Sequence, residues 1–217
     1  MTSEASCLTF LFREGNMEME DFGIYTIDKE YVRKLNEADS EVYFDEYTYD
    51  RKPYAGIMIF TGKYNYFIPL TSAKKKHADW NLISKDMYII YETMPDKKVR
   101  PNWVYRNNND GTVKHILSVL EIKKMIPVPD GLFKRIVFSD LDDKGYAMLL
   151  MKEYYFLKPY ADDILEKAYN IYETQKETGK INRFTCNYQF LEKICDTYET
   201  AENSNNDEEN ESETVTV

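Results

Sequence analysis

The first periodic stretch of the chain alternates apolar and polar residues over "GIYTI", residues 23–27, which predicts a short β-strand. Asp28 follows and can cap a helix over residues 29–38, "KEYVRKLNEA". The large apolar residues of that helix fall on one face: Tyr31, Val32 and Leu35. The start of the chain therefore predicts a strand followed by an amphipathic helix.

A β-hairpin is the clearest pattern in the sequence. "AGIMIF" at 55–60 and "YNYFIPL" at 64–70 flank the turn residues "TGK". Proline has no N–H to donate to a ladder, so pairing is expected to stop near Pro69. Thr71 and Ser72 are then expected at the end of a rigid strand.

The remainder of the chain predicts one more strand, a long connection and several helices. "MYIIYE" at 87–92 reads as a strand, whereas residues 93–115 contain two prolines and "NNNDG" and are expected to form an irregular excursion. Apolar character returns over 115–129. Helices are predicted at 145–158, 159–177 and 188–199, with Cys195 on the apolar stripe of the last one. The order of elements predicts an α+β protein built on a small barrel or twisted sheet, with a C-terminal helical segment.

Charge is distributed unevenly between the centre of the chain and its ends. The formal net charge is −10, but residues 201–217 hold six acidic and no basic residues and residues 1–20 carry −3, which leaves about −1 for residues 21–200. The acidity of the whole chain is thus no argument against a nucleic-acid partner. We expect a single domain over 21–200, preceded by an extension at 1–20 and followed by a disordered acidic tail at 201–217.

Several classes of chemistry have no support in the sequence. The three cysteines show neither zinc-like spacing nor a disulfide framework, and we found no phosphate-binding glycine loop, no GxSxG motif and no closely spaced pair of histidines. No apolar run approaches the ~18–20 residues of a membrane span. We therefore expect a soluble, cytoplasmic protein without metal or cofactor and without a membrane partner.

The segment that does carry candidate chemistry is "PLTSAKKKH", residues 69–77. Two hydroxyl residues and three lysines follow the predicted strand, and the region before it is rich in tyrosine and phenylalanine. Proteins often bind single-stranded RNA with cations interleaved among aromatic rings: the cations contact the phosphates and the rings stack on the bases. A capped loop with a solvated charge run remains the plainer alternative.

Four segments of the chain together resemble a known family. The ToxN/AbiQ-like endoribonuclease toxins of type III toxin–antitoxin systems have segments similar to "GIYTIDKEYVRKL", "RKPYAGI", "YFIPLTSAKKKH" and "KKMIPV", in this order and spacing. The N-terminal extension and the length of the chain resemble those of the CptN-like branch of this family. The resemblance implies a strongly bent antiparallel sheet, similar to Kid/MazF-type toxins, decorated by helices.

The resemblance also implies an activity, partners and a site. It implies metal-independent, sequence-selective cleavage of single-stranded cellular and phage RNA to 2′,3′-cyclic phosphate and 5′-hydroxyl ends, in phage defence by abortive infection. The expected partner is a repetitive, pseudoknot-like antitoxin RNA, which the toxin processes and then holds in a ring-like assembly. The family's active-site positions fall on Tyr31, Lys52, Thr71, Ser72 and Lys74. RNA contacts are expected from Arg51, Tyr47, Tyr49, Lys75, Lys76 and His77.

The side chains suit this reaction because the RNA supplies its own nucleophile. A lysine with its ordinary pKa near 10.4 is almost always protonated at neutral pH, so Lys74 and Lys52 are expected to stabilise the pentacovalent phosphate by charge. Thr71 and Ser72 would donate hydrogen bonds to its oxygens. Tyr31 could donate a proton in the reaction, or it could be a tyrosine of the hydrophobic core. His77 could act as a general acid or base, because its ordinary pKa lies near neutral pH, or it could instead cap a helix or bind a phosphate.

Two other functions remain open from the sequence. The same lysines and aromatics would serve a non-catalytic RNA-binding module. A protein-interaction scaffold that uses the acidic tail is the third possibility.

Overall fold

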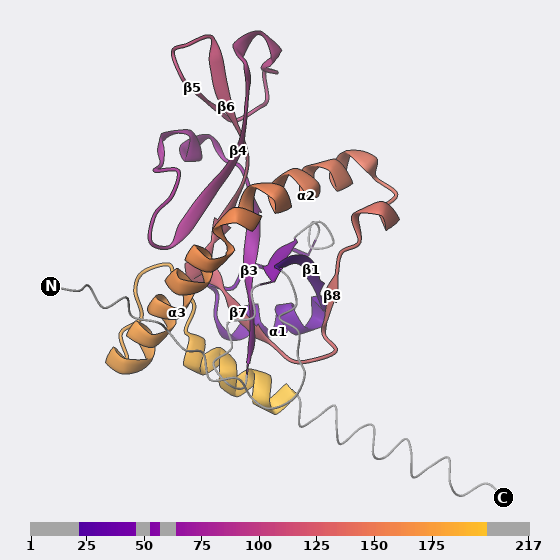
Figure 1. The fold of residues 1–217 in the computed structure, drawn as a ribbon. Helices are drawn as coiled ribbons and strands as arrows, with labels where there is room; N and C mark the ends of the chain where they lie inside the picture. The colour runs from indigo at the N-terminus through magenta and orange to yellow at the C-terminus, as the bar shows by residue number, and fades with distance from the viewer. Residues whose placement is uncertain (1–21, 47–52, 57–63, 199–217) are drawn as a thin grey trace, which may run out of the picture.

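The fold is a bent antiparallel β-sheet with helices packed against it (Figure 1). The computed structural model describes residues 22–46, 53–56 and 64–198. The strands are β1 Gly23–Ile27, β2 Tyr54–Gly56, β3 Asn65–Ser72, β4 Met87–Pro95, β5 Tyr105–Asn107, β6 Thr112–Glu121, β7 Ile126–Val128 and β8 Phe133–Arg135. The helices are α1 Lys29–Ala38, α2 Lys144–Leu157, α3 Ala161–Thr178 and a final helical segment over 188–198.

Eight strands form one sheet in the order β4-β6-β3-β2-β1-β8, with β5 paired to β6 and β7 paired to β3. Within the described residues the end strands β4 and β8 do not pair with each other, so the sheet is open and not a closed barrel. The α+β class, the antiparallel sheet and the C-terminal helices are confirmed. The likeness to Kid/MazF-type toxins stays a prediction.

Strand β3 is where the sheet bends. Its first half pairs with β2 on one edge and β7 on the other, and its last residues, Leu70 to Ser72, pair with β6. The strands β6 and β7 are joined by a single 3₁₀ turn, η4 Ile122–Lys124, so one continuous segment turns a corner along the edge of β3. Pairing with β2 ends at Pro69, as the sequence predicted, but the strand itself runs on to Ser72. The strand continues because Leu70 donates its N–H to the Pro53 carbonyl and the strand then takes β6 as a new partner.

The helix patterns predicted from the sequence are confirmed at their caps and buried faces. The Asp28 side chain accepts the Tyr31 N–H at the start of α1, and Tyr31, Val32 and Leu35 are the buried residues of that helix. Gly179 ends α3 with a left-handed φ of 63°. Helix α2 lies across β1, β4 and β6 (Figure 1). Cys195 is buried in the core, as its position on the stripe predicted.

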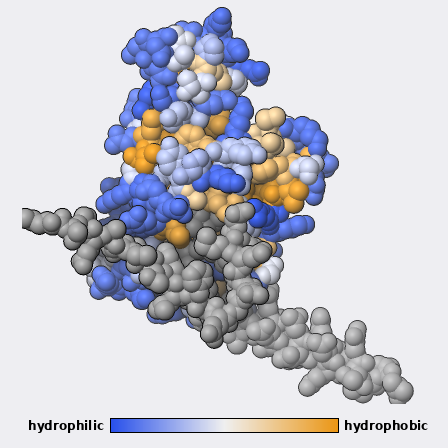
Figure 2. Space-filling model, viewed as in Figure 1, coloured by the Kyte–Doolittle hydropathy of each residue, from blue (hydrophilic) through white to orange (hydrophobic). Residues whose placement is uncertain are grey.

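The expected irregular excursion at 93–115 is instead a small β-lobe. Strand β4 runs on to Pro95, and β5 and β6 form a hairpin through Asn108 to Gly111, where Gly111 has a left-handed φ of 81°. The lobe projects away from the helices and its surface is mostly hydrophilic (Figures 1 and 2). Arg106 ties the lobe to the segment after β3 by donating to the Ala78 carbonyl at 2.6 Å. The prediction was wrong because it took the prolines as breaks in the strand. Pro95 is the last residue of β4, where the lack of an N–H donor hardly weakens the pairing.

The segments predicted as an N-terminal extension (1–20) and as a tail (201–217) lie outside the described residues. None of the helices in the described part of the chain combines the length and apolar character needed to cross a bilayer.

Candidate active site

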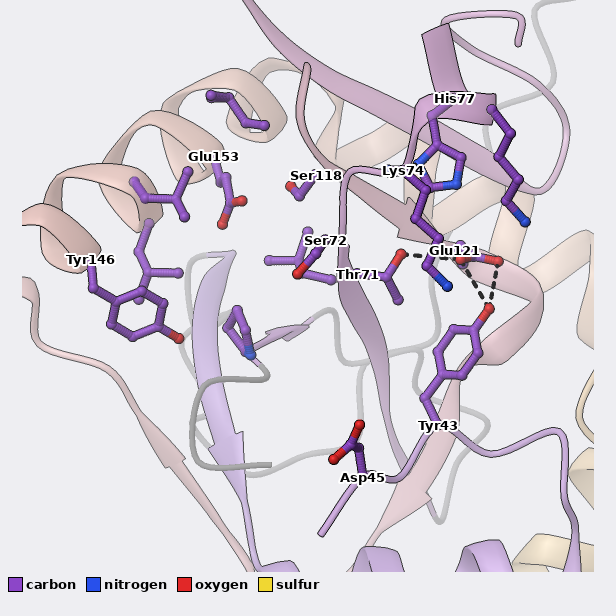
Figure 3. Close-up of a pocket in the computed structure, with 16 residues that line it drawn as sticks. Tyr43, Asp45, Thr71, Ser72, Lys74, His77, Ser118, Glu121, Tyr146 and Glu153 are labelled. Carbon is purple, nitrogen blue, oxygen red and sulfur yellow. Dashed lines mark hydrogen bonds between the residues drawn. The ribbon is translucent and has the colours of Figure 1, made fainter. Parts of the chain in front are cut away.

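A cavity of about 290 Å³ opens where β3 changes partners (Figure 3). One wall is formed by the end of β3 and the segment after it, another by β6, and a third by α2. Of the predicted site residues, the cavity brings five together: Thr71, Ser72, Lys74, Lys76 and His77. Pro53, which follows Lys52 directly in the sequence, also lines it.

Thr71 and Ser72 are held by the β3–β6 ladder, in which Thr71 lies opposite Val119 and Ser72 opposite Ser118. The Thr71 hydroxyl is 3.1 Å from Oε1 of Glu121, to which it donates. Ser72 is solvent-exposed at the strand end. The strand therefore fixes the two hydroxyl-bearing side chains at the mouth of the cavity, as the sequence predicted.

Lys74 is held by a reciprocal pair of hydrogen bonds with His77. The Lys74 N–H donates to Nδ1 of His77 at 3.0 Å, and the His77 N–H donates to the Lys74 carbonyl at 2.8 Å. This capping box begins the 3₁₀ helix η2, Lys75–Asp79. The backbone of Lys74 is thereby fixed while its amine reaches the cavity (Figure 3).

His77 itself is 2% exposed, and its ring packs on Trp80 with the centroids 4.7 Å apart. Burial lowers the pKa of His77, and the nearby positive charge of Lys76 lowers it further. A neutral ring keeps Nδ1 available as an acceptor, which the hydrogen bond from Lys74 requires. The capping role considered for His77 is confirmed.

Glu121, at the end of β6, was not predicted as a site residue. Besides the Thr71 hydroxyl, its carboxylate accepts the Tyr43 hydroxyl at 3.0 and 3.1 Å. Burial, together with the charge of Glu121, raises the pKa of Tyr43, so this phenol stays protonated and donates. The carboxylate thus orients a threonine on one side and a tyrosine on the other.

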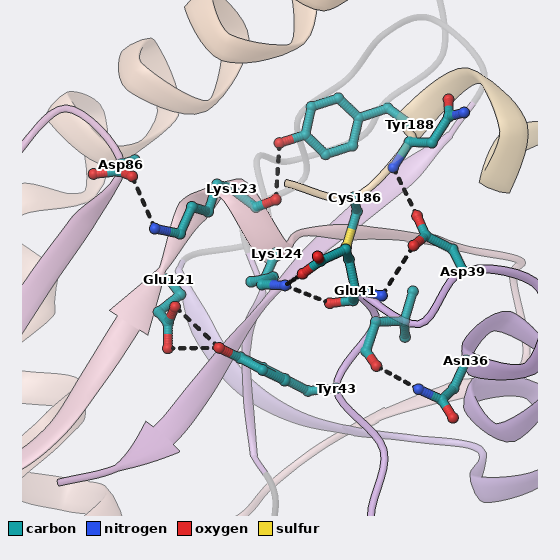
Figure 4. Close-up of polar contacts among 12 residues, drawn as sticks. Asn36, Asp39, Glu41, Tyr43, Asp86, Glu121, Lys123, Lys124, Cys186 and Tyr188 are labelled. Carbon is teal, nitrogen blue, oxygen red and sulfur yellow. Dashed lines mark hydrogen bonds and ion pairs between the residues drawn. The ribbon is translucent and has the colours of Figure 1, made fainter. Parts of the chain in front are cut away.

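A second polar network holds Tyr43 in place (Figure 4). The buried Lys124 amine donates to the backbone carbonyl of Glu41 at 2.8 Å and pairs with its carboxylate, and it lies 4.9 Å from the centre of the Tyr43 ring. Asn36 donates to the Val42 carbonyl at 2.7 Å. Because Lys124 belongs to the η4 corner, the bend of the sheet and the position of Tyr43 are coupled.

Glu153 on α2 is a further carboxyl group of the cavity, beside Glu121 and Asp45, and was also missed from the sequence. Its side chain is only 2% exposed, and its Oε2 has no hydrogen-bond partner among the described residues. Burial raises the pKa of Glu153 to about 7, and the neighbouring Ser118 hydroxyl acts in the opposite direction. A sequence signal did exist: Leu150, Glu153 and Leu157 share the buried face of the helix, so a charged residue interrupts an apolar stripe.

Not every predicted residue reaches the cavity. Tyr31 is fully buried in the core, where its hydroxyl donates to the Pro127 carbonyl at 2.7 Å and its ring packs edge-on against Tyr198. It is absent from the described cavity lining, which favours its interpretation as a core tyrosine. Lys75 is exposed and also absent from that lining. Four predicted residues lie outside the described part of the chain: Tyr47, Tyr49, Arg51 and Lys52.

Metal ligation has no support in the described part of the chain. Its His, Cys, Asp and Glu side chains form no group of three or more that could hold an ion. The groups that face the cavity are hydroxyls, amines, an imidazole and the three carboxyl groups of Asp45, Glu121 and Glu153. This set can bind an anionic oxygen and exchange protons.

The fold and the cavity together define a class: an α+β protein with hydroxyl, ammonium and carboxyl groups gathered at the bend of an antiparallel sheet. The family described as "Toxin ToxN, type III toxin-antitoxin system" matches residues 23–196. The chain belongs to this family, which confirms the resemblance drawn from its sequence motifs.

Named relatives and solved structures agree with this assignment. The chain is 28% identical over 183 residues to the endoribonuclease ToxN of Bacillus thuringiensis subsp. kurstaki, covering 80% of this chain and 82% of that protein. It is 27% identical over 171 residues to the endoribonuclease AbiQ of Lactococcus lactis subsp. lactis, covering 77% and 84%.

Among solved structures, one from work on selective toxin inhibition by a non-coding RNA pseudoknot superposes with a TM-score of 0.64. The two are 27% identical, and the match covers 83% of this chain and 99% of the other. The structure of the anti-phage endoribonuclease AbiQ superposes with a TM-score of 0.62 at 23% identity, over 83% and 99% of the two chains, and supports the fold alone.

Proposed function

We propose that this protein is an endoribonuclease toxin that cleaves single-stranded RNA by attack of a ribose 2′-hydroxyl on the adjacent phosphate. The observation that carries the proposal is the convergence of Thr71, Ser72 and Lys74 in one cavity at the end of a rigid strand. The products would be a 2′,3′-cyclic phosphate and a 5′-hydroxyl. Membership of the ToxN family and relatives named as endoribonucleases support the same reaction.

In this mechanism the cavity binds the scissile phosphate and stabilises its transition state. Ser72 donates to a non-bridging oxygen, and Thr71 does the same when it turns from Glu121 toward the phosphate. The Lys74 ammonium stabilises the charge that develops on the pentacovalent phosphorus. Lys52, directly before the cavity residue Pro53, is proposed to add a second positive charge. No metal ion is required in this scheme, because the RNA supplies the nucleophile.

The RNA strand on either side would be held by charge and stacking. Lys76 lies at the cavity with its amine 4.8 Å from the centre of the Trp80 ring, and Lys75 is exposed beside it. With Arg51, these lysines would contact phosphates, and Tyr47 or Tyr49 would stack on a base.

We further propose that the activity is held in check by a structured antitoxin RNA. A related structure was solved in work on inhibition by an RNA pseudoknot, and another in work on a processed non-coding RNA that regulates an antiviral system. Processing of a repetitive precursor, a ring-like assembly and a cytoplasmic role in abortive infection belong to this proposal. A 260/280 nm absorbance ratio well above that of protein alone, measured on the purified material, would support a bound RNA.

The reaction is tested by incubating the protein, freed of bound RNA, with a long A-rich transcript in the presence of EDTA. We expect discrete fragments ending in cyclic phosphate and beginning with 5′-hydroxyl, identified by end-labelling and mass spectrometry. The EDTA should not reduce the rate. Bound but intact RNA would instead support a non-catalytic RNA-binding module, and deletion of residues 201–217 should leave cleavage unchanged.

The change Tyr31→Phe distinguishes the two interpretations of Tyr31, as a core residue or as a catalytic group. A core tyrosine loses its hydrogen bond to the Pro127 carbonyl, so the free energy of unfolding should fall by about 1 kcal/mol while cleavage persists. Thermal denaturation and the cleavage rate would be measured on the same preparation. A variant that folds normally but no longer cleaves would establish Tyr31 as part of the chemistry.

A further inference from the structure

We propose that Glu153 is the general base of this site and takes the proton from the attacking 2′-hydroxyl, an inference that rests on the proposed function. The observation behind it is a carboxyl group buried in the cavity wall, one oxygen of which has no hydrogen-bond partner among the described residues. Three features of Glu153 support the inference: its lack of a structural role, its position opposite two serines, and its charge state.

Other buried glutamates in the described residues have clear structural partners, whereas Glu153 does not. Glu192 accepts hydrogen bonds from Tyr66 and Tyr172, and Glu121 accepts them from Tyr43 and Thr71. The Glu153 Oε2 atom accepts none from the described residues, although the side chain is only 2% exposed. A buried polar group without a partner destabilises the fold, so its presence calls for an explanation in function.

Its position fits a role on the substrate. Ser72 and Ser118 are directly opposite each other on β3 and β6, so their side chains lie on the same face of the sheet. The Ser118 hydroxyl forms no hydrogen bond of normal geometry with the described residues, but it lies close enough to Glu153 to lower the pKa of that carboxyl group. Glu153 projects from α2 toward these two serines (Figure 3). A phosphate held by Ser72 would therefore bring its neighbouring ribose to the Glu153 side of the cavity.

The charge state of Glu153 also suits a general base. Because burial raises its pKa to about 7, Glu153 is divided between its ionised and neutral forms near neutral pH, which is where a general base works best. On β4 the nearby Glu92 is already paired with Lys152 and His115. The charged and titratable groups around the cavity are Tyr43, Asp45, Lys74, Lys76, His77, Glu121 and Tyr146.

The proton balance of the step is complete. Ionised Glu153 accepts the 2′-hydroxyl proton as the 2′-oxygen forms its bond to phosphorus. The bond from phosphorus to the 5′-oxygen breaks, and that oxygen takes a proton from the Lys74 ammonium. Afterwards Glu153 returns its proton to water, and Lys74 regains one. Glu121 is less suited to this step, because the Tyr43 hydroxyl lies within hydrogen-bond distance of both of its carboxylate oxygens.

The test is the isosteric change Glu153→Gln, with Glu166→Gln on the exposed face of α3 as a matched control. We expect Glu153→Gln to slow cleavage by about 10²- to 10⁴-fold at pH 7, the usual contribution of a positioned base. Binding of a 2′-deoxy version of the substrate should be unchanged. The wild-type rate should rise with pH and level off above about 7, as Glu153 ionises. The rise of the rate with pH should be absent in Glu153→Gln and present in Glu166→Gln.

A second variant keeps the proposal testable should Glu153→Gln fail to fold. Ser118→Ala removes the hydroxyl that lowers the pKa of Glu153, so the rise of the cleavage rate with pH should move to higher pH. A purely structural Glu153 predicts no such movement. If the wild type cleaves but Glu153→Gln cleaves equally well with the same pH profile, the inference is wrong and the proposed function stands. If the wild type does not cleave RNA at all, both are wrong.

Discussion

The variant Lys74→Ala is expected to lose cleavage by about 10²- to 10³-fold at neutral pH, the usual effect of removing one preorganised donor from a developing oxyanion. The loss should appear in the rate of the chemical step, because the Lys74 ammonium acts on charge that forms only in the transition state. The fold should persist, because the side chain is exposed and the capping hydrogen bonds with His77 involve the backbone of residue 74. Single-turnover cleavage of a mapped RNA substrate measures the effect.

Lys75→Ala is the matched control for this prediction. Lys75 is the next residue, has the same charge and is exposed, but does not line the described cavity. It should weaken RNA binding modestly and in a salt-dependent way, with little change in single-turnover rate. Cleavage by Lys74→Ala at the wild-type rate would show that the phosphate is bound elsewhere.

The second large effect is on stability and concerns Glu192. This residue of the final helical segment accepts the Tyr66 hydroxyl at 2.8 Å and the Tyr172 hydroxyl at 2.9 Å, and so joins that segment to β3 and α3. In Glu192→Ala both buried phenols lose this acceptor, and each such loss costs about 1 to 3 kcal/mol. We expect a total near 3 kcal/mol, which lowers the Tm by roughly 6 to 12 °C for a domain of this size.

Two controls accompany this measurement by thermal denaturation. Glu192→Gln keeps an acceptor oxygen in place and should be destabilised less than the alanine variant. Glu166→Ala removes an exposed glutamate and should leave the Tm nearly unchanged. An unchanged Tm in Glu192→Ala would mean that water replaces the carboxylate in this network.

Two of the three carboxyl groups in the cavity, those of Glu121 and Glu153, have environments that suit different tasks. Glu121 is surrounded by donors, and its role is to orient Thr71 and Tyr43. Glu153 is almost completely buried in the cavity wall, and this burial favours its neutral form. The environment of each group, and not its chemical identity, separates the positioning carboxylate from the proposed base.

Local patterns in the sequence were sufficient for much of the fold. The alternation at 23–27, the Asp28 cap, the stripe of α1 and the Gly179 stop depend on interactions within a few residues, and the structure has all of them. Strands β5, β7 and β8 were missed because each is three residues long and exists only through its partners, and β6, Thr112–Glu121, was seen only as a return of apolar character after the excursion. Such short segments have no periodicity of their own to detect.

The sequence by itself determined the α+β class, the family resemblance and the hydroxyl–lysine segment from Thr71 to Lys74, because these features are contiguous along the chain. Only the tertiary structure brought Glu121 and Glu153, which lie about fifty and eighty residues later in the sequence, to the same cavity. The tertiary structure also placed Tyr31 in the core and His77 where its ring accepts the backbone N–H of Lys74. The physical reason is that burial and pKa depend on which segments pack together, and that is decided by the bend of the sheet and the helix that crosses it.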